Sequence, residues 1–151
     1  MDKVSQLLST KALLTMLTIV VAITLLLAGC KSRSLHNQIL DYCKNQEELS
    51  LSEITDFSWD VAYVDRQYYG SGEKLKESYN IEGKFQLLET DFSSRVAFCK
   101  DGRLVYDLVL NNFYFEFESS IEIIDRDSVF TINWSSVPDQ KEQKLLLSLQ
   151  E

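Results

Sequence analysis

The chain is short of the residues on which many enzymes depend. His36 is its only histidine, and it lies beside the N-terminal apolar segment rather than within the body of the chain that follows. A general base must lie within hydrogen-bond reach of the proton it removes. We therefore expect His36 in solvent, on a tether or a first helix, and a serine hydrolase is disfavoured because no usable histidine remains.

Several motifs that bind or transfer chemical groups are missing as well. Gly70-Ser71-Gly72 lacks the Gly-x-Ser-x-Gly spacing of a nucleophile elbow, and no Gly-Lys-Ser/Thr follows to make a phosphate-binding loop. Asp125-Arg126-Asp127 lacks the further acidic ligands and the glycine of a calcium loop and is interpreted as a turn. Structural zinc needs about four ligands, and Cys43, Cys99 and His36 fall short of that number. We expect no metal and no cofactor.

Basic residues are outnumbered by acidic ones. The 151 residues include 15 Lys and Arg against 23 Asp and Glu, which gives a net charge of −8. Such a surface repels phosphate backbones, and no basic stripe interrupts it, so nucleic acid is not an expected partner. The same charge disfavours close contact with an anionic membrane, from which we expect the domain to stand away.

One long hydrophobic run is present, at the N-terminus. Residues 12–28 carry no charge, Lys3 and Lys11 precede them, and Leu27-Ala28-Gly29-Cys30 ends the run. This ending resembles the lipobox of bacterial lipoprotein precursors. The resemblance implies that a diacylglyceryl group is attached to the Cys30 thiol and that a signal peptidase cuts just before Cys30. It also implies that acyl chains hold the mature protein to a membrane.

The resemblance divides the chain into a signal peptide over 1–29, a tether over 30–34 and a single extracytoplasmic domain over 35–151. An uncleaved transmembrane helix is the alternative, because the run reaches the lower end of the roughly 17–25 residues that span a bilayer. Cleavage is favoured by the small residues before Cys30, by the leucine three positions before it, and by the basic residues ahead of the run. Two or more acyl chains hold a protein firmly, since each buried methylene contributes about 0.8 kcal/mol.

Cys43 and Cys99 remain once Cys30 is acylated. An even pair of cysteines in an extracytoplasmic protein can form a disulfide, because such compartments are oxidising. The alternative is two buried free thiols, which behave as small hydrophobic side chains. The sequence leaves both open.

Hydrophobic spacing predicts the elements at the start of the domain. Apolar residues recur at helical spacing over 35–43, which predicts a helix over 34–48 capped by Ser34. Residues 65–72 are interpreted as a loop and residues 73–79 as a short helix. Between the two predicted helices, from residue 57, apolar side chains recur at every second residue, which is the spacing of a β-strand. The predicted strand has one aromatic face, formed by Phe57, Trp59, Val61 and Tyr63.

Asp101-Gly102 predicts a β-hairpin, since this dipeptide readily takes the positive φ angles of a type I′ turn. The flanking strands cover 94–100 and 103–110. A two-residue turn sets the register of the two strands, in which Cys99 pairs with Leu104 and Ala97 pairs with Tyr106. These four residues lie on one face of the hairpin, together with Leu108. Because the side chains of Ala97 and Cys99 are small, we expect the first helix to cover that face, which would make Cys43 and Cys99 near neighbours.

Alternating apolar residues predict further strands, which contain Phe113, Phe115 and Phe117, then Phe130, Ile132 and Trp134, and last Leu145, Leu147 and Leu149. The last strand is preferred to a helix that would begin at Ser136-Val137-Pro138-Asp139. Pro138 is the only proline, so the strands themselves are uninterrupted. With helix early and strands late, we predict an α+β fold, with an antiparallel sheet of about five strands and one or two helices packed on one face.

Two stretches carry a second resemblance. Residues 54–64 contain Asp56-Phe57-Ser58-Trp59-Asp60, and residues 96–105 contain Phe98-Cys99-Lys100-Asp101-Gly102. They resemble small bacterial lipoproteins and secreted proteins that have an Asp-Phe-x-Trp-Asp strand and a Phe-x-Lys-Asp-Gly hairpin. This resemblance implies an anchored α+β domain and no activity. Members commonly place a glycine or a proline before the tyrosine that follows the strand, whereas this chain has Asp65-Arg66-Gln67-Tyr68-Tyr69.

Two classes of function remain. The first is a non-enzymatic envelope protein whose acidic sheet or aromatic loop binds another protein. The second is a small acidic hydrolase or carbohydrate-active domain, in which Asp56, Asp60 and Asp65 around one strand would supply an acid and a base. Asp60 lies opposite the aromatic face and is interpreted as a solvated residue or a partner of backbone amides. We favour the first class and predict no catalytic residues.

Overall fold

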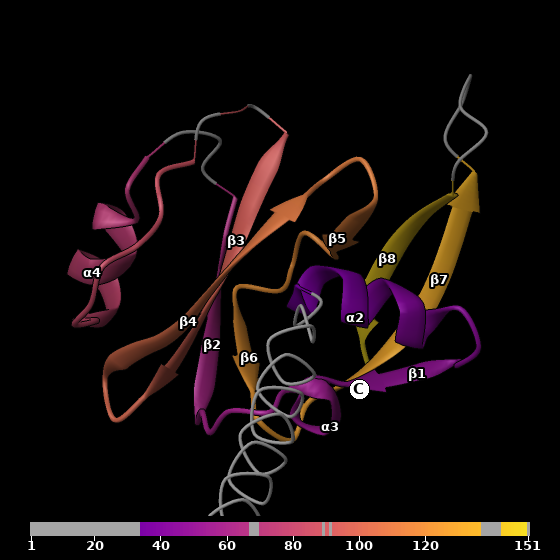
Figure 1. Ribbon diagram of the computed structural model, residues 1–151, viewed down its shortest axis with the longest axis horizontal. Helices are drawn as coiled ribbons and strands as arrows, with labels where there is room; N and C mark the ends of the chain where they lie inside the picture. The colour runs from indigo at the N-terminus through magenta and orange to yellow at the C-terminus, as the bar shows by residue number, and fades with distance from the viewer. Residues whose placement is uncertain (1–33, 67–69, 89, 91, 137–142, 151) are drawn as a thin grey trace, which may run out of the picture. The chain divides into compact units, whose positions relative to one another are not determined.

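The computed structural model describes residues 34–66, 70–88, 90, 92–136 and 143–150. The predicted signal peptide, Cys30 and the first residues of the tether lie outside this part of the chain, as does Pro138. Ser34–Glu151 make one compact unit. In chain order its elements are α2 (Leu35–Cys43), β1 (Glu48–Ser50), α3 (Leu51–Ile54), β2 (Val61–Asp65), α4 (Glu73–Tyr79), β3 (Ser93–Lys100), β4 (Arg103–Asn111), β5 (Phe115–Phe117), β6 (Ile123–Asp125), β7 (Val129–Ser136) and β8 (Gln143–Leu149) (Figure 1).

The described strands form two four-stranded sheets. Sheet A has the order β1-β7-β8-β5, and sheet B has the order β4-β3-β2-β6. Neighbouring strands are antiparallel except β5 and β8, which run parallel. The α+β class is confirmed, but the prediction of one antiparallel sheet of about five strands is wrong. The chain leaves sheet B after β4 and enters sheet A with β5, and the apolar alternation that marks each strand does not say which strands pair.

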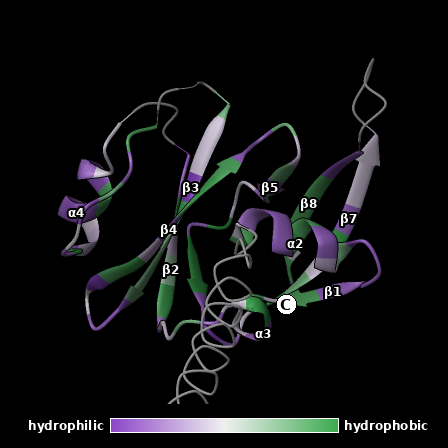
Figure 2. Ribbon diagram, in the orientation of Figure 1, coloured by the Kyte–Doolittle hydropathy of each residue, from purple (hydrophilic) through white to green (hydrophobic). Residues whose placement is uncertain are grey.

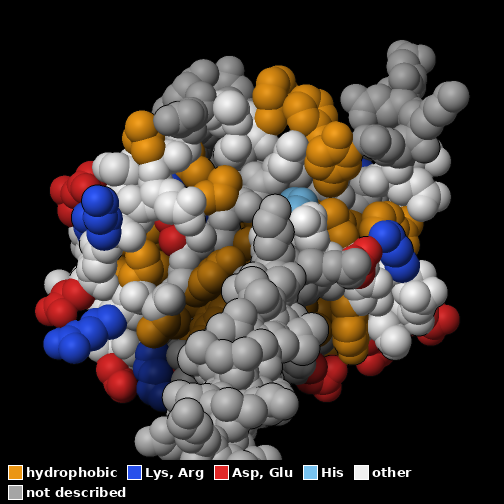
Figure 3. All heavy atoms as spheres, in the orientation of Figure 1, with side chains coloured by type: hydrophobic (Ala, Val, Ile, Leu, Met, Phe, Trp, Pro, Cys, Tyr) orange, Lys and Arg blue, Asp and Glu red, His pale blue; other side chains and the backbone are white. Residues whose placement is uncertain are grey.

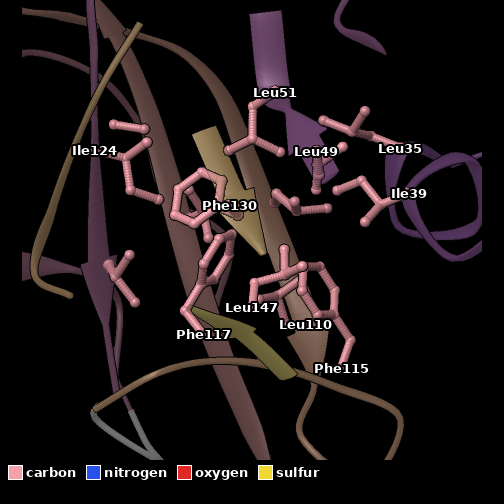
Figure 4. Close-up of a cluster of buried hydrophobic side chains, with 14 of the residues drawn as sticks. Leu35, Ile39, Leu49, Leu51, Leu110, Phe115, Phe117, Ile124, Phe130 and Leu147 are labelled. Atoms are coloured by element: carbon pink, nitrogen blue, oxygen red, sulfur yellow. The ribbon is translucent and has the colours of Figure 1, made fainter. Parts of the chain in front are cut away.

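One hydrophobic core lies between the two sheets, and every described element other than α4 supplies a buried side chain to it. Phe117 and Phe130 of sheet A lie near its centre, with their ring centroids 5.3 Å apart (Figure 4). Fully burying one such side chain stabilises a fold by roughly 1.5–3 kcal/mol. The largest fully buried apolar side chains of this core are Trp59, Phe98, Phe115, Phe117, Phe130, Ile39, Leu49, Leu51, Leu110, Ile124 and Leu145.

Sheet B is also covered on its other face. Leu75 of α4 packs there with Ile81, Phe85, Ala97 and Cys99 in a second, smaller cluster. The helix α4 is mainly hydrophilic and the strands β2 and β8 are mainly hydrophobic (Figure 2). The helix α2 packs in the main core and α4 packs in the second cluster. The prediction that the helices share one face of a sheet is therefore wrong.

The hairpin of β3 and β4 is confirmed. Asp101 and Gly102 have φ angles of 50° and 73°, as a type I′ turn requires, and Cys99 pairs with Leu104. The register then shifts by one residue, because Val105 is inserted between the residues that pair with Cys99 and Phe98. The predicted pair of Ala97 with Tyr106 is therefore wrong. Ala97 lies opposite Asp107, Phe98 lies opposite Tyr106, and Leu108 packs in the main core rather than beside Ala97.

The strand predicted from residue 57 begins only at Val61. Asp60 donates a backbone hydrogen bond of 2.8 Å to the carbonyl of Cys99, which is also the partner of Val61, so two consecutive residues lie opposite one. The alternation shifts at this point. Trp59 lies in the main core, whereas Val61 and Tyr63 pack against the second cluster.

Candidate functional site

A fully buried arginine lies on the face of sheet B that carries the second cluster. The Arg95 guanidinium donates hydrogen bonds from Nη2 to the carbonyls of Gly70 (3.2 Å) and Gln86 (2.7 Å). It lies 5.1 Å from the centroid of the Phe85 ring, and Nη1 lies 3.5 Å from Oδ2 of Asp107. We call Arg95, Asp107, Phe85 and these two carbonyls the Arg95 cluster. It ties residues 70–86 to the sheet.

Two carboxylates lie near this guanidinium. The side chain of Asp107 is 5% exposed, and its Oδ2 accepts a hydrogen bond of 2.7 Å from the backbone amide of Gln86. Asp65, which is also buried, pairs across the strands with Arg95. Burial raises the pKa of Asp107, the Gln86 amide and the Arg95 charge lower it, and the nearby Asp65 charge raises it again, with a net rise. The cluster thus holds one buried cation beside a carboxylate whose pKa lies above its ordinary value.

An acidic hollow lies at the C-terminal end of α2. Its volume is about 580 Å³. The Tyr42 hydroxyl donates a hydrogen bond of 3.2 Å to Oε2 of Glu53, and partial burial and then this carboxylate raise the pKa of Tyr42. A hollow with this charge suits a basic group. The hollow is lined by Tyr42, Asn45, Gln46, Glu47, Glu48, Ser50, Glu53 and Val129.

Exposed aromatic side chains gather at the start of β3 and in the connection from β4 to β5. Phe92 is 54% exposed, Phe113 is 38% exposed, and their ring centroids lie 4.4 Å apart. Tyr114 follows with 38% of its surface exposed. We call Phe92, Phe113 and Tyr114 the aromatic end. In Figure 3 hydrophobic side chains gather at the top of the view, where Figure 1 places the start of β3 and the connection from β4 to β5.

Among the residues that the structure describes, no three His, Cys, Asp or Glu side chains are grouped as a metal site would require. No described helix is long and apolar enough to cross a membrane.

No protein-family model matches this chain, and no curated protein or solved structure is significantly similar to it.

His36 lies on the first turn of α2 and is half-buried, rather than in solvent as predicted. Its ring centroid lies 6.1 Å from that of Phe115. Burial lowers the pKa of His36, so the imidazole is neutral at neutral pH. Nδ1 is buried without a hydrogen-bond partner among the described residues. Nothing in this setting orients the imidazole as a base.

Cys43 and Cys99 are both buried free thiols, so of the two alternatives the structure contains the second. Cys43 lies in the main core and Cys99 in the second cluster. The prediction that the first helix covers Ala97 and Cys99 is wrong, because α2 packs in the main core and α4 packs on that face. Burial raises the pKa of Cys43 to about 12 and that of Cys99 to about 11, so neither forms a reactive thiolate at neutral pH.

The three carboxylates of the hydrolase hypothesis do not converge. Asp60 is exposed, and its Oδ2 accepts a hydrogen bond of 3.1 Å from the amide of Asp101, as predicted. Asp65 lies at the opposite end of β2, which places the two about 16 Å apart along the strand. Asp56 is exposed and precedes the strand. They do not form the pair that a glycosidase needs.

The loop motifs have structural roles in the described residues. Gly72 has a φ of 74° and precedes the first residue of α4, as expected for a loop that leads into a helix. Arg126 and Asp127 form the predicted turn, and Arg126 donates a hydrogen bond of 2.6 Å to the carbonyl of Trp59. Tyr68 and Tyr69, the aromatic part of the predicted binding loop, lie outside the described residues.

Proposed function

We propose that this chain is the precursor of a bacterial lipoprotein, anchored to a membrane by acyl chains on Cys30, whose extracytoplasmic domain binds another envelope protein. The observation that carries the proposal is the spacing between anchor and domain. The apolar run ends in Leu27-Ala28-Gly29-Cys30, and the compact unit begins at Ser34, only four positions later. Anchor and folded unit follow one another directly, as a signal peptide with a short tether requires.

A binding role is better supported than catalysis. Asp107 borders two surface hollows, but its side chain is only 5% exposed, and its Oδ2 accepts a hydrogen bond from the Gln86 amide and lies 3.5 Å from the buried Arg95 guanidinium, so this carboxylate already has structural partners. A general acid and base must reach the substrate directly or through one water molecule. The acidic hollow is lined by Glu47, Glu48 and Glu53 and suits a basic surface of a partner.

The anchor is tested by changing Cys30 to serine, which removes the thiol that accepts the diacylglyceryl group. We expect the variant to incorporate no radiolabelled palmitate and to remain at the size of the uncut precursor. Cys99→Ala is the matched control, since it removes a different cysteine and should leave labelling and cleavage unchanged. Undiminished label in Cys30→Ser would disprove the lipoprotein proposal.

The binding role is tested by crosslinking the protein in its own membrane. We expect a defined adduct with one envelope protein, and we expect Glu47→Lys to abolish it, because the exposed Glu47 lines the acidic hollow and like charges repel a basic partner. Asp125→Lys makes the same charge change at an exposed position of sheet B and should leave the adduct intact. Equal capture by both variants would show that the hollow is not the binding surface.

A further inference from the structure

The aromatic end is an ordered part of the fold. The backbone amide of Asn112 donates a hydrogen bond of 2.8 Å to the carbonyl of Phe92, which holds the start of β3 against the end of β4. The amide of Tyr114 donates to the carbonyl of Asn111 (3.0 Å), and the amide of Leu145 donates to the carbonyl of Tyr114 (2.9 Å). These bonds hold the backbone that carries the Phe92 and Phe113 rings, which lie at an angle of 33° to one another and are 54% and 38% exposed. Exposed apolar patches of this kind mark sites of interaction.

The domain begins at this same end. A second hollow, of about 360 Å³, is lined by Ser34 and His36 together with Ser93 and Asn111. Ser93 follows Phe92 directly, and Asn111 is two residues before Phe113. The first described residue of the chain therefore shares one small hollow with residues that adjoin the aromatic pair in the sequence.

The tether is too short to separate this end from a membrane. A chain of four residues spans at most about 14 Å, so an acylated Cys30 lies within that distance of Ser34. Building on the proposed function, we infer that the aromatic end rests in the lipid–water interface of the bilayer that holds the Cys30 acyl chains. Aromatic rings favour this layer because one part of it is apolar and the other is hydrated.

This contact gives the anchored domain an orientation. The helix α2 has nine residues and is about 13 Å long, and the acidic hollow lies at its far end. The length of this helix therefore separates the hollow from Ser34, and the hollow is open to a partner. The acidic charge that disfavours lying flat on an anionic membrane is compatible with contact through one apolar end. Glu89 and Asp91, which flank this end in the sequence, make a zwitterionic lipid the appropriate probe.

Quenching of tryptophan emission by brominated lipid tests the inference. The full chain carrying Phe113→Trp is acylated in the host cell, purified and reconstituted into phosphatidylcholine vesicles with and without bromine on the acyl chains. We expect the brominated lipid to reduce the emission added by this variant. Val105→Trp is the control, since Val105 is 42% exposed and lies about 20 Å from Asn111 along β4. Its emission should not change. The parent chain, with its two native tryptophans, supplies the background.

The other possible results of this experiment separately contradict the membrane contact, the orientation of the domain and the lipid anchor. If the Phe113→Trp chain carries the acyl label but its added emission is not quenched, the membrane contact is overturned and the anchor stands. Equal quenching of both variants overturns the orientation. If an unquenched residue 113 instead crosslinks to a membrane protein, the aromatic end binds protein and the inference is wrong. A wild-type chain without acyl label overturns the proposed function, and the palmitate measurement identifies that failure separately.

Discussion

Replacing Arg95 with methionine is expected to lower the free energy of unfolding by about 3–5 kcal/mol at neutral pH, the usual cost of removing one partner of a buried ion pair. Methionine fills most of the volume beneath Phe85, but it donates nothing to the carbonyls of Gly70 and Gln86. It also leaves the buried carboxylate of Asp107 without its cation. Denaturant unfolding monitored by circular dichroism measures the loss.

The loss of stability in Arg95→Met should depend on pH, and the pKa of Asp107 decides whether the loss grows or shrinks as pH falls. Because the net shift raises its pKa in the folded protein, the native state holds this proton more tightly than the unfolded chain does. The contribution of Asp107 to the free energy of unfolding is fully present below the pKa that it has in the unfolded chain. This contribution is lost as pH rises through the higher pKa that it has in the folded protein. Removing the Arg95 charge removes one of the causes that lower this pKa. The penalty of Arg95→Met should therefore shrink as pH falls through the pKa of Asp107.

A second variant separates charge from packing. Asp107→Asn keeps an acceptor for the Gln86 amide and mimics the protonated acid, so Arg95→Met combined with Asp107→Asn should be more stable than Arg95→Met alone. Losses that simply add, or an Arg95→Met penalty that is constant with pH, would show that the charges of the Arg95 cluster do not interact as described.

Gly72→Ala is expected to destabilise the protein by about 1–3 kcal/mol more than Gly102→Ala, the usual cost of overpacking a well-packed site. The two glycines have nearly the same backbone angle, with φ of 74° and 73°, so alanine suffers the same left-handed strain at each. They differ in the space around them. A Cβ on Gly72 would lie 2.6 Å from Nη1 of Arg95 and 2.6 Å from Cγ of Phe85, whereas a Cβ on Gly102 meets nothing within 4 Å.

Because the backbone strain is the same in both variants, the difference between their free energies of unfolding measures the packing of the Arg95 cluster around Gly72. Midpoints of denaturant unfolding give the difference directly when the slopes agree. Equal losses would mean that the Arg95 and Phe85 side chains move aside without cost, in which case the cluster is not tightly packed.

Local features of the fold were predictable from the sequence. The hairpin of β3 and β4 follows from Asp101-Gly102, because the turn chemistry and the alternation lie within one short stretch. The helix α4 was predicted with the bounds 73–79 that the structure has. The last strand, β8, was correctly preferred to a helix. Each of these depends on contacts between residues that are near one another in the chain.

Pairing between distant strands was not predictable. The parallel pair of β5 and β8 joins Phe115 to Leu145, and the alternation of either strand fits an antiparallel partner equally well. The three-residue strands β1 and β6 were missed because so short a stretch shows no period. Without them, a single sheet was the simplest arrangement.

The Arg95 cluster was missed because of one inserted residue. Arg95 lies two positions before Ala97 and so shares its face, which places a charge among small buried side chains in the sequence. In the predicted register Asp107 faces the opposite side of the hairpin. The extra residue Val105 rotates β4 by one position, and this brings Asp107 to the side of Arg95. An arginine on an otherwise apolar strand face was the signal available.

Sheet A has a consequence for how the chain folds as it is made. Its strand β1 pairs with β7, so residues 48–50 have a strand partner only after residues 129–131 have been synthesised. Contacts so far apart in sequence form slowly, since a long loop must close first. The main core draws on the same strands, because Leu49 packs with Phe130 and Leu147 in it. Sheet A and the part of the main core that it supplies are therefore expected to form after the local hairpin of β3 and β4.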